Sequence, residues 1–226
     1  MIPIQPLFIF GDSVIKGVMH ENGRYKLCED HDFASLNARG IEAHNHSKMG
    51  ATIRTGLDIM RRKLTPCDEE TLVLLSFGGN DCDYNWSEVA ADPDGIHMPH
   101  IEPDEFAALY REAIELARAS GAKVAAASIV PIEARRYMHT ISEGKSGENI
   151  LKWLGDVDRL YRWQESYNQI ACSVAGKLGC QILDIRSAFL QSACFPTLMS
   201  DDGIHPSPAG HALLHRTVRA ALCGIE

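Results

Sequence analysis

The chain has 226 residues, of which 45% are hydrophobic and 23% are charged, a composition typical of ordinary soluble globular proteins. This length is sufficient for one domain with a substantial core, so we expect a single domain over residues 1–226. The formal net charge of −8 argues against a nucleic-acid-binding protein, because such proteins usually carry a basic face.

The chain contains no run of about 18 apolar residues, and its first residues lack the basic and apolar regions of a signal peptide. Its seven cysteines are odd in number and scattered, and none of them forms a C-x-x-C pair. They therefore predict neither a zinc motif nor a thioredoxin-like motif. We expect free thiols in a cytoplasmic protein that has no membrane partner.

Short apolar runs rich in β-forming residues alternate along the chain with helical patterns. The predicted strands cover residues 7–10, 41–44, 71–77, 123–130 and 181–185. The predicted helices cover residues 51–64, 103–120, 156–178 and 208–222. Such alternation is typical of an α/β fold, with right-handed crossovers and a parallel sheet covered by helices on both faces. Ligands of such sheets gather at the carboxyl ends of the strands.

Two further segments, residues 83–103 and 132–155, are predicted to be long loops. The second follows the fourth predicted strand, at the edge of the sheet where ligands gather, and it carries arginines and aromatic residues. We interpret residues 132–155 as a lid or a substrate-recognition loop. A solvated excursion of the chain is the alternative.

The first predicted strand runs directly into Gly11, Asp12 and Ser13. A serine at the turn between a strand and a helix either caps the helix or is presented as a nucleophile. These few residues fit both interpretations, whereas Asp12 is best interpreted as a residue that supports the turn.

A carboxylate and an imidazole near the end of the chain help to decide between them. Asp202 and His205 are three residues apart, so the carboxylate can meet Nδ1 in a turn and leave Nε2 free to accept a proton. Asp201 is the rival carboxylate, but the spacing favours Asp202. With this pair present, the nucleophilic interpretation of Ser13 is preferred. The elbow motif of α/β-hydrolases is absent, since Ile15 replaces its second glycine.

Two other segments predict donors for a negatively charged oxygen. "SFGGND" follows the third predicted strand and places Asn80 on the functional edge, and "NHSKMGAT" follows the second and places Gly50 there. Together with the backbone N–H of Ser13, these groups can form an oxyanion hole. Asp81 and Asp83 are interpreted as supporting or solvated residues.

Four blocks in chain order, "FGDSV", "NHSKMGAT", "GGND" and "DDGIHPSPAGH", resemble those of the SGNH hydrolases, also called GDSL esterases and lipases. The resemblance implies one hydrolase domain, folded as a three-layer α/β/α sandwich around a five-stranded parallel sheet (flavodoxin-like). By position it implies Ser13 as nucleophile, Asp202 and His205 as its relay, and Ser13, Gly50 and Asn80 as oxyanion donors. Val14 replaces the leucine of the family name, which should not affect the chemistry.

The resemblance implies a serine esterase that acts on a small-molecule ester. The sequence shows no hydrophobic cap or long apolar insertion that would suggest a lipid, so we expect short-chain acyl esters, including O-acetylated carbohydrates. Trp153 and Trp163 fit either a substrate pocket or the core. An acyltransferase with the same site and a non-catalytic binding module on this fold are the alternatives.

No cofactor or metal is predicted. Two histidine pairs have spacings that could suit a metal, but no matching acid or cysteine cluster accompanies them: His44-x-His46 and His97-x-x-His100. His211 and His215 are assigned to the last predicted helix. The oligomeric state is not indicated by any heptad or apolar stripe.

Overall fold

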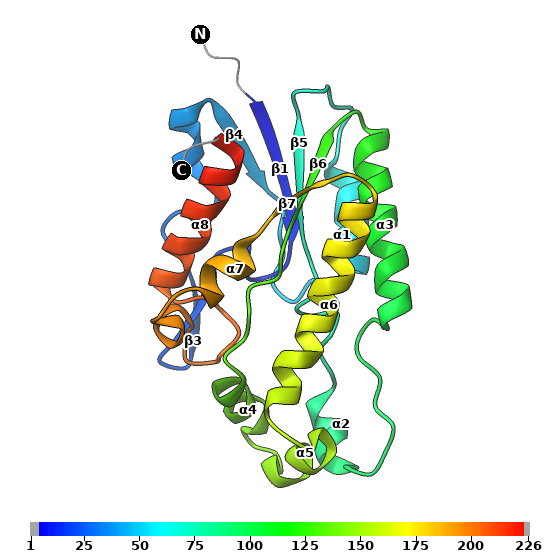
Figure 1. Cartoon of the computed structure of the whole chain (residues 1–226), viewed down its shortest axis with the longest axis vertical. Coiled ribbons are helices and arrows are strands. Elements are labelled where there is room, and N and C mark those ends of the chain that lie inside the picture. The colour runs from blue at the N-terminus through cyan, green and yellow to red at the C-terminus, as the bar shows by residue number, and fades with distance from the viewer. Residues whose placement is uncertain (1–4, 224–226) are drawn as a thin grey trace.

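A computed structural model describes residues 5–223 and shows a parallel sheet between two layers of helices (Figure 1). The strand order is β4-β1-β5-β6-β7, and every neighbouring pair is parallel. The five strands are β1 (Gln5–Gly11), β4 (Ile41–Asn45), β5 (Leu72–Ser76), β6 (Lys123–Ala127) and β7 (Gln181–Leu183). All five lie where the sequence predicts strands, and the three-layer α/β/α sandwich is confirmed.

The central strands are buried on both faces, which explains their nearly continuous apolar sequences. In β5, Val73 and Leu75 pack on one side of the sheet and Leu74 packs on the other, all without measurable exposure. The first side is covered by α1 (Ile53–Lys63), α3 (Pro103–Ala119) and α6 (Asp158–Lys177). The second side is covered by α7 (Ile185–Leu190), α8 (Pro208–Cys223) and the 3-10 helix η1 (Ala34–Arg39).

Local signals in the sequence set the ends of the long helices. The side chain of Thr52 caps the start of α1, and three basic residues fill its last turn, where positive charge is favourable. Helix α3 begins with Pro103, carries acidic residues in its first turn and gives way to Gly121, whose φ is 104°. The predicted helices are therefore confirmed within one or two residues at each end.

The segments expected as long loops are instead partly helical. They contain α2 (Trp86–Ala91), α4 (Ala134–Ser142) and α5 (Gly147–Leu154), which gather at the lower end of the molecule in Figure 1, beyond the carboxyl ends of the strands. Their apolar residues pack together with Leu160 of α6 as a third hydrophobic cluster. We call α2, α4, α5 and the first turn of α6 the helical cap. The loop prediction is wrong because each helix is only six to nine residues long and has too few turns to show a clear period.

A β-hairpin follows the first strand, where the sequence suggests the start of a helix. Strands β2 (Val18–Glu21) and β3 (Arg24–Leu27) pair antiparallel around Asn22 and Gly23, which both have positive φ. This turn favours Asn-Gly, because both central residues must adopt left-handed backbone. A turn of residues 13–17 connects β1 to this hairpin, so Ser13 does not begin a helix.

Candidate active site

Ser13 lies in the tight turn that follows β1, at the carboxyl edge of the sheet. The turn is held by Asp12, whose Oδ1 accepts the N–H of Val14 at 2.9 Å and whose backbone oxygen accepts the N–H of Lys16 at 3.1 Å. Gly11 has no room for a side chain, because a Cβ there would collide with Ile15 and lie 2.6 Å from the backbone oxygen of Ser76. The glycine thus lets β1 end tightly against β5, and the turn presents the Ser13 hydroxyl.

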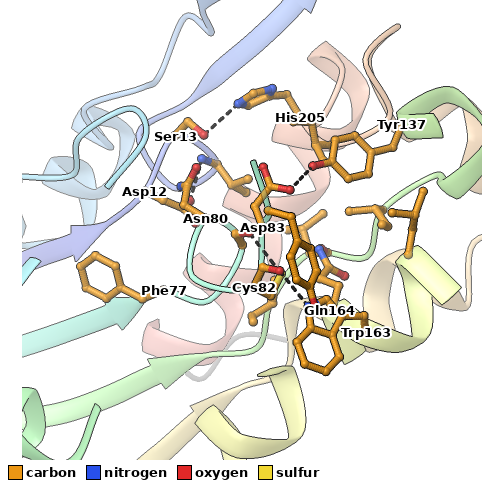
Figure 2. A pocket seen from close by; sticks show the side chains of 18 of the residues that line it. Asp12, Ser13, Phe77, Asn80, Cys82, Asp83, Tyr137, Trp163, Gln164 and His205 are labelled. Atoms are coloured by element: carbon orange, nitrogen blue, oxygen red, sulfur yellow. Dashed lines mark hydrogen bonds between the residues drawn. The ribbon is translucent and has the colours of Figure 1, made fainter. Parts of the chain in front are cut away.

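The structure brings Ser13, His205 and Asp202 together although 192 residues separate the serine from the histidine. Ser13 Oγ lies 2.8 Å from His205 Nε2, and His205 Nδ1 lies 2.6 Å from Asp202 Oδ2 (Figure 2 shows the first contact). All three side chains are buried, with residue exposures of 7% or less. The result is one continuous chain of hydrogen-bonding groups from hydroxyl to carboxylate.

The environment of Asp202 keeps it ionised. Burial alone would raise the pKa of this carboxyl group, but the hydrogen bond and charge of His205 and the N–H groups of Ile204 and His205 outweigh it, so the pKa is lowered. Those N–H groups lie 3.1 and 3.0 Å from Oδ1. One oxygen therefore fixes the loop, and the other is left to orient the imidazole. The ring of Tyr25 contacts His205 edge-on, with centroids 5.5 Å apart.

The 199–207 loop, which carries Asp202 and His205, is attached to α4 of the helical cap. The N–H of Glu133 donates to the oxygen of Gly203 at 2.8 Å, and Thr140 Oγ1 donates to the oxygen of Asp202 at 3.2 Å. Arg136 donates to the oxygen of Met199 at 2.8 Å. Gly203 has φ 76°, and a Cβ there would lie 2.5 Å from a backbone nitrogen of α4. Only glycine allows the loop to approach the helix so closely.

Two of the three predicted oxyanion donors, Asn80 and Gly50, lie on segments that a hydrogen bond joins. Asn80 follows β5 and lines the pocket next to Ser13, and its Nδ2 donates one hydrogen to the oxygen of Ala51 at 3.2 Å. Gly50, the residue before Ala51, is exposed and has φ 74°, but it does not line the pocket. Within the described part of the chain, the N–H groups of Ser13 and Gly50 donate to no protein acceptor.

Two acidic residues near the candidate active site, Asp12 and Asp81, are buried. Burial raises the pKa of Asp12 to about 6 against the hydrogen bond from Val14, and it raises the pKa of Asp81 to about 7. Asp81 is completely buried and accepts the N–H of Ile53 at 2.8 Å, and the negative charge of Asp12 raises its pKa further. A solvated position for Asp81 is thus excluded.

A pocket extends from Ser13, Asn80 and His205 into the helical cap (Figure 2). Its wall is dominated by aromatic and aliphatic side chains, namely Tyr84, Trp86, Ile129, Val130, Ile132, Tyr137, Trp153, Leu154, Leu160, Trp163 and Ile204. Both tryptophans that the sequence left undecided therefore line this pocket. The expectation that no hydrophobic cap exists is wrong, because the apolar surface is assembled from several short segments rather than one insertion.

The polar groups of the pocket wall are largely paired with one another. Asp83 Oδ1 accepts from Tyr137 Oη at 2.6 Å and from Trp86 Nε1 at 2.8 Å. Burial raises the pKa of Asp83 against these two hydrogen bonds. Trp163 Nε1 donates to the oxygen of Cys82 at 2.8 Å. The wall thus offers apolar ring faces with few free donors, a feature that no local sequence pattern indicates.

A sequence model of the GDSL-like lipase/acylhydrolase family matches residues 9–213. The chain belongs to this family. It is accordingly a carboxylic ester hydrolase, and its substrates are small-molecule esters. None of the curated proteins matches the chain. In residues 5–223, no helix has both the length and the apolar character needed to span a bilayer.

Several solved structures share the fold of this hydrolase. A lipase/acylhydrolase from Enterococcus faecalis is 17% identical with a TM-score of 0.67, covering 97% of this chain and 96% of that one. LAE5, an alpha/beta hydrolase enzyme from the metagenome of Lake Arreo, Spain, is 18% identical with a TM-score of 0.67, covering 100% and 98%. The acetylxylan esterase Axe2 from Geobacillus stearothermophilus is 19% identical with a TM-score of 0.67, covering 97% and 94%. At these identities the likeness shows the fold alone.

Proposed function

We propose that this hydrolase cleaves short-chain acyl esters through an acyl-enzyme formed on Ser13. The observation that carries the proposal is the contact of Ser13 Oγ with His205 Nε2 at 2.8 Å, backed by Asp202 at 2.6 Å, at the end of an apolar pocket. A buried hydroxyl in contact with an oriented imidazole is the arrangement that nucleophilic catalysis requires. The chain of contacts from Ser13 through His205 to Asp202 supports both acylation and deacylation.

In the first step, Ser13 Oγ attacks the carbonyl carbon of the ester while His205 Nε2 accepts the hydroxyl proton. Asp202 holds the imidazole and stabilises its positive charge. His205 then returns the proton to the departing alcohol, and the acyl group stays on Ser13. In the second step, water attacks this acyl-enzyme with His205 again as base, which releases the carboxylic acid and restores the serine.

The developing negative charge on the carbonyl oxygen requires hydrogen-bond donors. The Ser13 N–H, the Gly50 N–H and the second amide hydrogen of Asn80 are proposed to fill this role. Their availability supports it, because neither backbone N–H donates elsewhere among the described residues and Asn80 uses a single bond to Ala51. That bond also fixes the Asn80 segment against the Gly50 segment.

The pocket wall favours an apolar acyl group. Its rings and aliphatic chains offer contact area, and its polar atoms are occupied by one another at Asp83, Tyr137 and Trp86. A polar substrate group buried there would find few partners, which is unfavourable. We therefore place the acyl chain of the ester in the pocket, against the helical cap. An acyl chain of a few carbons fills this pocket better than an acetyl group does.

The direct test is hydrolysis of p-nitrophenyl acetate, butyrate and octanoate by the wild type and by folded Ser13→Ala. We expect Ser13→Ala to lose activity, and we expect kcat/KM to rise from acetate to butyrate by up to roughly fourfold per buried methylene. Equal activity in both proteins would refute the role of Ser13. A fall from acetate to butyrate would refute the acyl pocket while leaving Ser13 in place.

O-acetylated carbohydrate is the second candidate substrate. The half-buried ring of Trp153 lines the pocket, with the Arg159 guanidinium carbon 4.8 Å from the ring centroid. Such a ring offers a surface for the apolar face of a sugar. Axe2, which shares the fold, is an acetylxylan esterase. Release of acetic acid from acetylated xylo-oligosaccharides, compared with release from p-nitrophenyl acetate, distinguishes the two candidates.

A further inference from the structure

Three side chains outside the pocket, those of Cys28, His211 and His215, bring metal-binding atoms together. The sulfur of Cys28 and one imidazole nitrogen each from His211 and His215 all lie within 4.8 Å of one another. Cys28 follows strand β3, and the histidines are one turn apart on α8, so they share one face of that helix. In Figure 1, β3 and α8 lie on the same side of the sheet.

One nitrogen of each imidazole faces a neighbouring oxygen, at hydrogen-bond distance for His211 and slightly farther for His215. His211 Nε2 lies 2.9 Å from the backbone oxygen of Val18, which can only accept, so Nε2 carries the proton and Nδ1 has the lone pair. His215 Nδ1 faces the carboxylate of Asp30 at 3.6 Å, which is longer than a hydrogen bond. An oxygen acceptor behind the imidazole, as at His211, is the usual way in which proteins orient metal-binding histidines.

The remaining nitrogens are buried without a partner. Among the described residues, His211 Nδ1 and His215 Nε2 have no hydrogen-bond partner, and both atoms are shielded from solvent. His211 is 2% exposed and Cys28 is 8% exposed. Buried polar atoms in proteins are nearly always paired, so two unpaired nitrogens on the histidines that approach Cys28 point to a missing shared partner.

We propose that Cys28, His211 and His215 bind one Zn²⁺ ion. Two imidazoles and one thiolate form a donor set that suits this borderline-soft ion, with one tetrahedral position left for a water molecule. Zn–N distances of about 2.0–2.1 Å and a Zn–S distance of about 2.3 Å bring tetrahedral ligands to roughly 3.3–3.6 Å from one another. Binding therefore requires side-chain rotations that bring the three atoms closer than the 4.8 Å within which they now lie. On binding, the thiol of Cys28 loses its proton to solvent and its sulfur forms the bond to zinc.

The site would fasten together the two chain segments that carry Ser13 and His205. The oxygen of Ser13 accepts the N–H of Val18 at 3.0 Å, and the N–H of Cys28 donates to the oxygen of Gly17 at 2.8 Å. Helix α8 begins three residues after His205. A bound ion therefore links the turn of Ser13 to the helix that follows His205, without touching the reacting atoms.

The test uses full-length protein that is stripped with a chelator, passed through gel filtration and then titrated with Co²⁺ or Zn²⁺. We expect one equivalent of Co²⁺ to give the visible absorption of a tetrahedral complex together with a thiolate-to-cobalt charge-transfer band, and Zn²⁺ to displace it. Zn²⁺ should also raise the Tm, because it binds only the folded state.

Cys28→Ser keeps the shape of the side chain and removes the thiolate, so it should abolish the charge-transfer band and lower Zn²⁺ affinity by at least about 100-fold. Cys194→Ser, which changes an exposed free thiol, is the matched control and should behave like the wild type. His211→Ala should lose binding as well. If it fails to fold, Cys28→Ser still decides the question. A wild type that shows no such band and no rise in Tm, or equal affinity in wild type and Cys28→Ser, would overturn the proposal.

Discussion

Ser13, Asn80 and His205 lie on short turns fixed to the ends of strands or to the start of α8, whereas the pocket beside them is walled by the helical cap. The first region is held by backbone hydrogen bonds and close glycine contacts, such as those of Gly11 and Gly203. The second is held by side-chain packing between short helices, in which Tyr84, Trp86 and Trp153 meet ring to ring.

On the proposed mechanism, the first region determines reactivity and the second determines which esters are preferred. A reaction centre needs particular residue types at fixed positions, so changes there should affect all esters alike. A wall of packed rings needs only shape and apolar surface, so changes there should alter the preference among esters. The following variants test that division, starting with the largest expected effect.

Asp202→Asn should lower kcat by on the order of 10⁴, because an amide can hold the imidazole in the wrong tautomer and cannot stabilise its charge. The loss should be similar for acetate and butyrate esters, as measured by steady-state kinetics. Asp201→Asn, at the exposed neighbouring residue, is the control and should retain activity. Loss in Asp201→Asn with retention in Asp202→Asn would reverse the assignment.

Asn80→Ala should lower kcat by on the order of 10²–10³ with little change in KM, because the lost donor acts mainly on the transition state. The exposed Asn37 in η1 provides the control variant Asn37→Ala. Single-turnover measurement of acylation checks that the affected step is chemistry. An unchanged kcat would remove Asn80 from the oxyanion hole.

Trp153→Ala should lower kcat/KM for p-nitrophenyl butyrate by up to about fifteenfold more than for the acetate, since two buried methylenes are worth roughly 1.6 kcal/mol. Leu151→Ala changes an exposed residue of the same helix, 40% accessible, and should leave the ratio unchanged. Equal losses for both esters would indicate that the cap supports the reaction centre rather than the acyl chain.

The buried carboxyl group of Asp12 also provides a test based on the stability of the protein. Because its pKa is higher in the folded chain than the ordinary value of 3.8, the folded state binds more protons between about pH 4 and 6. The free energy of unfolding therefore falls as pH rises through this range. Asp12→Asn should make that fall smaller, as measured by denaturant unfolding at several pH values.

The sheet could be predicted from sequence because its strands are buried on both faces. Residues 71–77 are nearly all apolar. Runs of this kind, when they are bounded by turns and alternate with long amphipathic helices, are compatible with few folds other than a buried parallel sheet. The spacing of Asp202 and His205 also predicted that they meet, because three residues form one turn. Their roles, like those of Ser13, Gly50 and Asn80, stay predictions that the variants above test.

The β2–β3 hairpin and the helical cap could not be predicted from the sequence in the same way. The Asn22-Gly23 turn does carry a hairpin signal, but the strands beside it are four residues long, and β3 is exposed throughout, so no alternation of burial marks them. The helices of the cap are stabilised mainly by tertiary packing, which single-sequence periodicity does not contain. Cys28 and His211 lie far apart in sequence, and only the fold brings them together.

The bond between the Glu133 N–H and the oxygen of Gly203 attaches the loop of His205 to the start of α4. The position of the imidazole relative to Ser13 therefore depends on how the helical cap packs, as well as on the sheet.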